Sequence, residues 1–198
     1  MAGPVEIRAA KRPIRVAACL AVLVASLALL AAPAGARSSR TQAVGLASSV
    51  CASVSPAAVS ALVGYTVPAA TLSLRRIPAT SKNHGISAVV TTCTFGTASS
   101  MKAVLKDVTL VFEVTSRSLT LSAVESDLKA AVVGSTMRVS VTTYPSFGVP
   151  AVYLTESGDG IKGTSIAAFV GTHEYSATVL EPIAPSKLAA LAKLAASI

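Results

Sequence analysis

The sequence contains no tryptophan, and aromatic residues make up only 4% of its 198 residues. Proteins that bind single-stranded nucleic acid stack the bases on aromatic side chains. Such a stacking surface is missing here, so nucleic acid is not an expected partner. The same shortage argues against a carbohydrate site that depends on aromatic stacking.

Histidine is almost as scarce, with His84 and His173 as the two examples. We expect both in exposed loop or hairpin positions. His173 and Glu174 would point to opposite faces of a strand, which disfavours a zinc site. The turn from Glu156 to Gly160 has too few oxygen ligands for a recognised calcium loop. With no glycine-rich phosphate loop or Rossmann signature either, neither a metal nor a cofactor is expected.

No catalytic set of acid, base and nucleophile stands out. The segment Gly163 to Ala167 places Ser165 in a sequence one residue short of a nucleophile elbow. That elbow needs a strand followed by a helix, and here a strand is predicted to continue. The sequence therefore predicts a protein that is not an enzyme.

The first 36 residues have the three parts of a secretory signal peptide. Basic residues up to Arg15 precede an uncharged apolar run of 17 residues, Val16 to Ala32, and small residues follow it at Ala34-Gly35-Ala36. We expect cleavage before Arg37. Because about 20 apolar residues span a bilayer, a retained N-terminal anchor is the alternative. Both outcomes place the rest of the chain in the cell envelope or outside the cell.

The remaining 162 residues are the size of one domain. Residues 37–49 are small and polar and predict a flexible tether, followed by a domain over 50–198. Cys51 and Cys93 are the cysteines of this part, and in an oxidising compartment an isolated pair predicts a disulfide. Closing a loop of this length would contribute about 4 kcal/mol to stability.

Helix and strand signals predict an α+β domain, in which two or three helices cover a meandering antiparallel sheet. A helix over 56–63 has Ser55 as N-cap and Gly64 as its stop. Val108, Leu110, Phe112 and Val114 predict the buried face of a half-buried strand, with the polar residues on the other face. A second helix begins with a capping box of Ser122 and Glu125 and ends at Gly134, and Ser186 caps a closing helix. The strands are predicted at 66–77, 86–95, 107–115, 137–143, 149–155, 164–170 and 174–180, with a hairpin turn at Gly171-Thr172.

A modest excess of positive charge is the main clue to a partner. Without residues 1–36 the chain has 13 basic and 8 acidic residues, a net charge of +5. Arg75, Arg76 and Lys82, with His84 nearby, form the one local basic cluster. The cluster suits a solvated hairpin end, and its functional alternative is contact with an anionic envelope polymer or with lipid headgroups.

The layout resembles a group of poorly characterised two-cysteine secreted proteins and lipoproteins of actinobacteria. The shared features are Cys51, Leu62-Val63-Gly64, Cys93 before Phe95, the turn Phe147-Gly148-Val149-Pro150 and the closing helix. This resemblance covers about residues 50–198 and implies a fold similar in outline to the PsbP-like α/β folds. It implies no catalytic residues. Phe95 stands where members of the group often have tryptophan.

The sequence thus favours an exported, non-enzymatic module that binds an unidentified ligand or protein partner. One alternative is a hydrolase or transferase whose site is assembled from residues distant in sequence. Another is a structural or sensory accessory domain of an envelope complex. A pocket with convergent titratable groups would favour the enzyme, an apolar cavity would favour a binding module, and a flat, filled surface would favour the accessory domain.

Overall fold

A computed structural model of the chain describes residues 50–80, 85–96, 101–131, 138–158 and 161–198. The predicted signal peptide and tether lie outside these residues, as do Lys82, His84 and Gly134. Among the described helices, none has both the length and the apolar character needed to cross a membrane.

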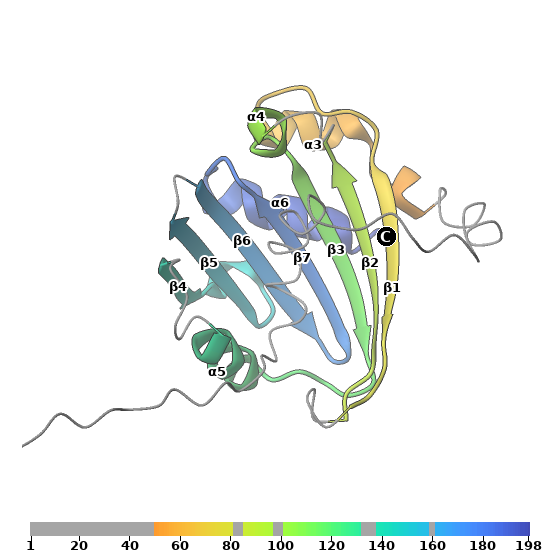
Figure 1. Cartoon of the computed structure of the whole chain (residues 1–198), viewed down its shortest axis with the longest axis vertical. Coiled ribbons are helices and arrows are strands. Elements are labelled where there is room, and N and C mark those ends of the chain that lie inside the picture. Colours follow the sequence, from red (N-terminus) through yellow and green to blue (C-terminus); the bar gives the residue numbers. More distant parts are fainter. Residues whose placement is uncertain (1–49, 81–84, 97–100, 132–137, 159–160) are drawn as a thin grey trace, which may run out of the picture.

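The strands form one seven-stranded sheet in which all neighbours are antiparallel, in the order β1-β2-β3-β7-β6-β5-β4. Two meanders, β1 to β3 and β4 to β7, join where β3 pairs with β7 (Figure 1). The predicted α+β class is confirmed. The strands are β1 (Thr71–Ile77), β2 (Ala88–Phe95), β3 (Val108–Thr115), β4 (Arg138–Thr143), β5 (Ala151–Gly158), β6 (Ile161–Val170) and β7 (His173–Val179).

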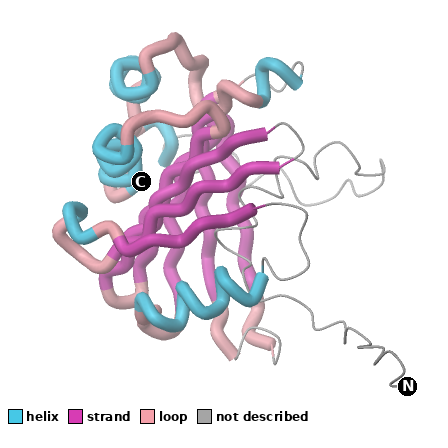
Figure 2. The backbone as a smooth tube through the Cα atoms, turned by 90° about the vertical axis from the view of Figure 1, so that its left-hand side faces the viewer, coloured by secondary structure: helices cyan, strands magenta, loops and turns pink. Residues whose placement is uncertain are grey.

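Four described α-helices and one short 3₁₀ helix accompany the sheet. In Figure 2 most of the helical turns lie to one side of the twisted strands. The sequence predicted three of the α-helices but not the short α4. These elements are α3 (Pro56–Val63), α4 (Met101–Val104), α5 (Leu121–Ala131), η2 (Pro145–Phe147) and α6 (Pro185–Ala195).

The first helix begins and ends as the sequence predicts. The Ala58 N–H donates to Ser55 Oγ at 3.0 Å, which satisfies one of the free amides of the first turn. Gly64 closes α3 with a φ of 87°, a left-handed conformation that glycine adopts without strain.

The predicted caps of the other two helices are wrong. At α5 the Ala123 N–H donates a hydrogen bond to Thr120 Oγ1 at 3.3 Å, so Thr120 is the N-cap rather than Ser122. Glu125 accepts a bond from the Thr143 hydroxyl of β4 instead of closing a capping box. At α6 the N-cap is Ala184, which offers no side-chain bond, rather than Ser186. Proline at the first helical position, which needs no amide partner, starts α6 instead.

Residues directly opposite each other in the sheet point to the same face, so the register divides the strand side chains into two sets. Face A carries Val108, Leu110, Phe112 and Val114 of β3 and the residues in line with them. Face B carries Thr109, Val111, Glu113 and Thr115 and their partners.

The main core lies between face A and the two helices α3 and α6. Leu188 and Leu191 of α6 are fully buried against Leu110 and Ile166, while Leu194 and Ile198 pack at the rim as the apolar stripe predicts. A smaller core on face B lies between α5 and strands β4 to β6, built around Val152, Leu154, Ala167 and Phe169. The sheet is therefore covered by different helices at different places on its two faces.

Candidate functional site

The predicted disulfide is confirmed. Cys51 and Cys93 are joined, with Cα atoms 5.6 Å apart, and both are buried in the core between face A and the helices. The bond links the segment before α3 to the C-terminal half of β2. It belongs to the core, so neither Cys51 nor Cys93 is a free thiol.

The structure does not place the predicted basic residues on one surface. Arg75 and Arg76 are consecutive in β1, so their side chains leave opposite faces of the sheet. Arg76 is in line with Val89 on face A, whereas Arg75 is in line with Val90 on face B. Lys82 and His84 lie outside the described residues. A shared anion site of Arg75 and Arg76 is thus not formed within the described part of the chain.

Part of face A forms a surface that we call the open patch. It consists of two neighbouring rows of side chains that cross strands β1, β2, β3, β7 and β6. The helices α3 and α6 pack on the other end of the same face. The patch residues are Leu74, Arg76, Val89, Phe112, Val114, Val170, His173 and Tyr175.

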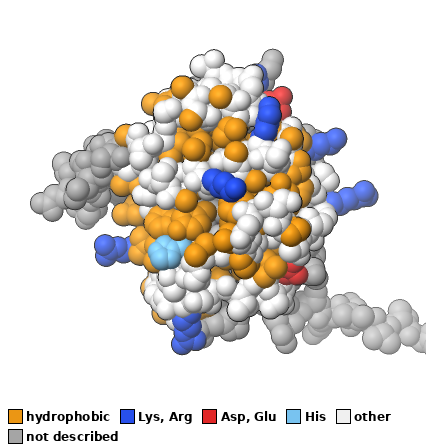
Figure 3. All heavy atoms as spheres, turned by 180° about the vertical axis from the view of Figure 1, so that it is seen from behind, with side chains coloured by type: hydrophobic (Ala, Val, Ile, Leu, Met, Phe, Trp, Pro, Cys, Tyr) orange, Lys and Arg blue, Asp and Glu red, His pale blue; other side chains and the backbone are white. Residues whose placement is uncertain are grey.

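The open patch holds every large hydrophobic side chain that is exposed in the described residues. Leu74 is 51% exposed, Val89 40% and Val170 46%, while the rest of its apolar side chains are half-buried. Figure 3 shows this side of the molecule, where hydrophobic side chains gather beside a histidine. Isolated exposed hydrophobic residues are ordinary, but their concentration on one surface is typical of a binding site.

Three aromatic rings stand together within the patch. Phe112 lies with its ring centroid 5.7 Å from that of His173 and 5.4 Å from that of Tyr175, with nearly parallel planes. His173 is thus a hairpin residue, as predicted, and it takes part in a stack. Such contacts hold the rings in fixed orientations and stabilise the surface beyond its buried area.

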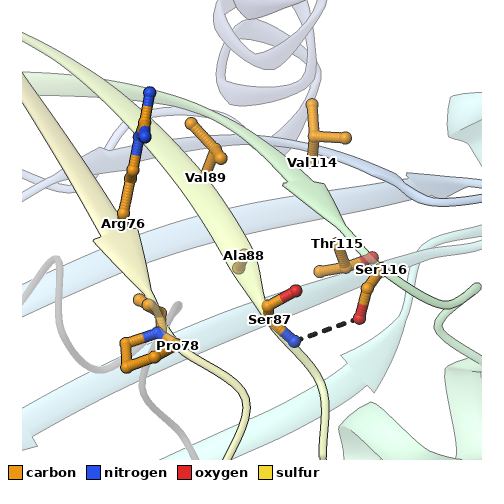
Figure 4. Close-up of a pocket in the computed structure, with 9 residues that line it drawn as sticks. Arg76, Pro78, Ser87, Ala88, Val89, Val114, Thr115 and Ser116 are labelled. Carbon is orange, nitrogen blue, oxygen red and sulfur yellow. Dashed lines mark hydrogen bonds between the residues drawn. The ribbon is translucent and has the colours of Figure 1, made fainter.

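At the β1 end the patch borders a hollow of about 470 Å³ at the edge of the sheet. Its strand residues come from both faces: Arg76, Val89 and Val114 from face A, and Ile77, Ala88 and Thr115 from face B. In Figure 4 the side chains of Arg76, Val89 and Val114 rise to the same side from three neighbouring strands. Pro78 and the Ser87-Ser116 pair close the strand ends, where the Ser87 N–H donates to Ser116 Oγ at 3.0 Å. The hollow is therefore mainly apolar, with one guanidinium at its side.

Behind the open patch, face B carries buried carboxylates instead of exposed apolar side chains. Glu113 and Glu174 face each other directly across β3 and β7 and are only 4% and 2% exposed. Burial, followed by the charge of Glu174, raises the pKa of Glu113 to about 8. Burial also raises the pKa of Glu156 on β5 to about 7. At neutral pH the Glu113–Glu174 pair therefore holds a proton, because two adjacent buried carboxylates resist double ionisation.

Hydroxyl groups form another row across face B, separated from the carboxylate pair by the row that contains Val111 and Ser176. Thr71, Thr94, Thr109, Thr178 and Ser165 lie in line on five neighbouring strands. The oxygens of Ser165 and Thr178 are 2.9 Å apart and share a hydrogen bond. Ser165 thus lies within a strand, bonded to a second hydroxyl, and no described histidine or carboxylate activates it.

Neither the open patch nor the Glu113–Glu174 pair was predicted from the sequence. Both depend on the pairing of β3 with β7, whose residues are about 60 positions apart in the chain. The period-two alternation of strands could have separated Arg75 from Arg76, since consecutive strand residues point to opposite faces. It could not have revealed which strands are neighbours.

Comparison with known proteins adds no assignment: no protein-family model, curated protein or solved structure matches the chain. The resemblance to two-cysteine actinobacterial proteins therefore stays a prediction. Within the described residues, no three histidine, cysteine or acidic side chains are grouped to hold a metal ion. The open patch is the candidate site with the clearest physical signature.

Proposed function

We propose that this chain is an exported, non-enzymatic binding module and that the open patch is its binding surface. The observation that carries the proposal is the gathering of Leu74, Val89 and Val170, all 40% exposed or more, around a fixed aromatic stack. Covering such a surface removes apolar area from water and favours association by about 25 cal/mol per Å². The partner is accordingly apolar at the surface that it presents.

The rest of the molecule supports binding rather than catalysis. Arg76, His173 and Tyr175 are the residues with charged or titratable side chains in the patch, and no carboxylate is among the patch residues. The two buried glutamates lie on the opposite face of the sheet. The patch thus has no carboxylate to act with His173 as an acid and base pair.

Binding to the patch is testable with Nile red, a neutral dye whose fluorescence rises in apolar surroundings. We expect the wild-type full chain to bind the dye, and a Val89→Ser, Val170→Ser double variant to bind it at least about fivefold more weakly, because two exposed apolar contacts are lost. Background fluorescence from tryptophan is absent, since the chain has none.

The matched control replaces Ala61 and Ala69, which are exposed outside the patch, with serine. This variant should bind the dye like the wild type. Equal dye binding by both double variants would show that the patch is not the binding surface.

Export is a separate part of the proposal and has its own test. The apolar run followed by Ala34-Gly35-Ala36 supports cleavage by a signal peptidase. Protein recovered from outside the cytoplasm should begin at or near Arg37. An intact Met1 on that material would instead indicate a retained N-terminal segment.

A further inference from the structure

The two faces of the sheet differ in charge: face B holds the glutamates of the described strands together with Arg75, and face A holds none of them. All three glutamates in the described strands, Glu113, Glu156 and Glu174, point to face B. The charged strand residues on face A are all basic: Arg76, Arg138 and Lys162. The helices on face A contribute no acidic residue, since α3 has no charged residue and α6 has only lysines. An apolar ligand that also carries negative charge would therefore meet no carboxylate from the described strands, α3 or α6 on this face.

Arg76 is placed to receive that negative charge. It lines the hollow at the β1 edge of the open patch, beside Val89 and Val114. A guanidinium binds phosphate or carboxylate oxygens through paired N–H donors. The Ser116 hydroxyl already accepts a bond from the Ser87 N–H, so its proton remains available to donate.

The apolar path leads away from Arg76 across the sheet. Val89 is directly opposite Val114, and Val114 is directly opposite His173. With strands about 4.8 Å apart, the row from β1 to β7 extends over about 14 Å, the reach of a dodecyl chain. The second row of the patch, with Phe112 and Tyr175, lies alongside this path. The hollow of about 470 Å³ is within the range of about 300–1,000 Å³ found for small-molecule sites.

From these observations we infer that the open patch binds a single-chain anionic amphiphile, with its headgroup at Arg76 and its alkyl chain along Val89, Val114 and His173. The inference rests on the proposed function, because it names the ligand class of the same surface. A single molecule suits the hollow better than a flat bilayer does, since α3 and α6 stand on the same face beside the patch.

The test compares ligands that share one tail, all used below their critical micelle concentrations with the full chain. Dodecyl phosphate supplies the tail with an anionic headgroup, dodecylphosphocholine supplies it with a zwitterionic one, and inorganic phosphate supplies the anion alone. Calorimetry should show dodecyl phosphate binding most tightly. Inorganic phosphate should bind at least about tenfold more weakly, because the apolar contacts are missing.

Arg76→Ser and Arg75→Ser form a matched pair of variants, since they remove the same charge from adjacent residues on opposite faces. Arg76→Ser should weaken dodecyl phosphate binding about tenfold, the size of one charge-assisted hydrogen bond. Arg75→Ser should weaken it less than about twofold, because an exposed charge on the far face is screened by salt. The melting temperatures of both variants show whether the fold is intact.

Each other result overturns the inference in a distinguishable way. Equal binding of both dodecyl ligands, with no effect of Arg76→Ser, would leave the patch as an apolar surface and refute the anionic ligand. Equal losses in the two arginine variants would indicate a general effect of net charge. Binding only to phosphatidylglycerol vesicles would identify a membrane surface instead of a single amphiphile. If neither Nile red nor any dodecyl ligand binds, the proposed function fails as well.

Discussion

In one region of the sheet, face B buries charged side chains while face A leaves apolar side chains exposed. Glu113 and Glu174 on face B are almost inaccessible, whereas Leu74 and Val89 on face A are 51% and 40% exposed. In β3 the same contrast appears within one strand, because Glu113 is buried and its neighbours Phe112 and Val114 are only half-buried. Position in the sheet, rather than the hydrophobicity of the residue, decides burial here. Apolar surface left exposed on a stable domain is then available for binding.

Within face A, the part covered by α3 and α6 and the open patch are stabilised by different interactions. The disulfide, α3 and α6 all lie at the covered part, where side chains such as Leu110 are fully buried. The open patch has the aromatic stack but no helix packed on it within the described residues. Stability and binding should therefore respond to substitutions in different parts of the same face.

Loss of the disulfide should have the largest effect on the covered part. Replacing Cys51 and Cys93 together with serine should lower the free energy of unfolding by about 4 kcal/mol, because the unfolded chain gains the entropy of an open loop. Denaturant titration of the two proteins measures this difference. The Nile red affinity of the fraction that remains folded should not change. A loss of dye binding by that fraction would show that the open patch depends on the covered part of face A.

Two leucines on face A provide a direct comparison of its parts. Leu110→Ala, at a fully buried position, should lower the free energy of unfolding by about 2–5 kcal/mol through lost contacts and a cavity. Leu74→Ala, at a position 51% exposed, should change it by no more than about 0.5 kcal/mol. Thermal and denaturant unfolding of both variants checks the prediction. Similar costs at the two positions would mean that the open patch is part of the core.

The buried carboxylates of face B should produce an effect on stability that depends on pH. The pKa of Glu113 rises from 4.5 to about 8 on folding, so the folded state binds more protons than the unfolded chain between these values. The stabilising contribution is complete below about pH 4.5 and is lost as pH rises through about 8. Glu156, with a pKa raised to about 7, acts in the same direction. Melting temperatures should fall from pH 5 to pH 8.

Glu113→Gln removes one titrating group while keeping the side-chain size. Its melting temperature should fall less over the same pH range than that of the wild type. Glu181→Gln, at an exposed position, is the control and should keep the wild-type slope. Identical slopes for all three proteins would refute the raised pKa of Glu113.

Local features of the fold could be predicted from the sequence, and long-range ones could not. Ser55 and Gly64 define α3 through bonds to residues within four positions, and Gly171 turns the β6-β7 hairpin with a φ of 60°. The disulfide followed from the number of cysteines and the expected compartment. Thr120 caps α5 in place of Ser122, and with hydroxyl residues at 118, 120 and 122 the sequence offers more than one candidate cap.

The candidate site could be predicted least, because its residues come from strands that are distant in sequence. The alternation in β3 separates Phe112 and Val114 from Glu113 but does not tell which face is covered. That outcome depends on where α3, α5 and α6 pack, and on β3 pairing with β7. The hollow at Arg76 likewise needs the ends of β1, β2 and β3 side by side.

The arrangement of β1 has a consequence for self-association. As the outermost strand it leaves one row of backbone amides and carbonyls without a strand partner in the described sheet. Such edges can template the growth of aggregates when they are long and uncharged. Arg75 and Arg76 place a positive charge on each face of this edge, so a second copy that docked edge to edge would bring like charges together. Charged side chains on an exposed edge strand oppose such association, and Arg75 and Arg76 supply them on β1.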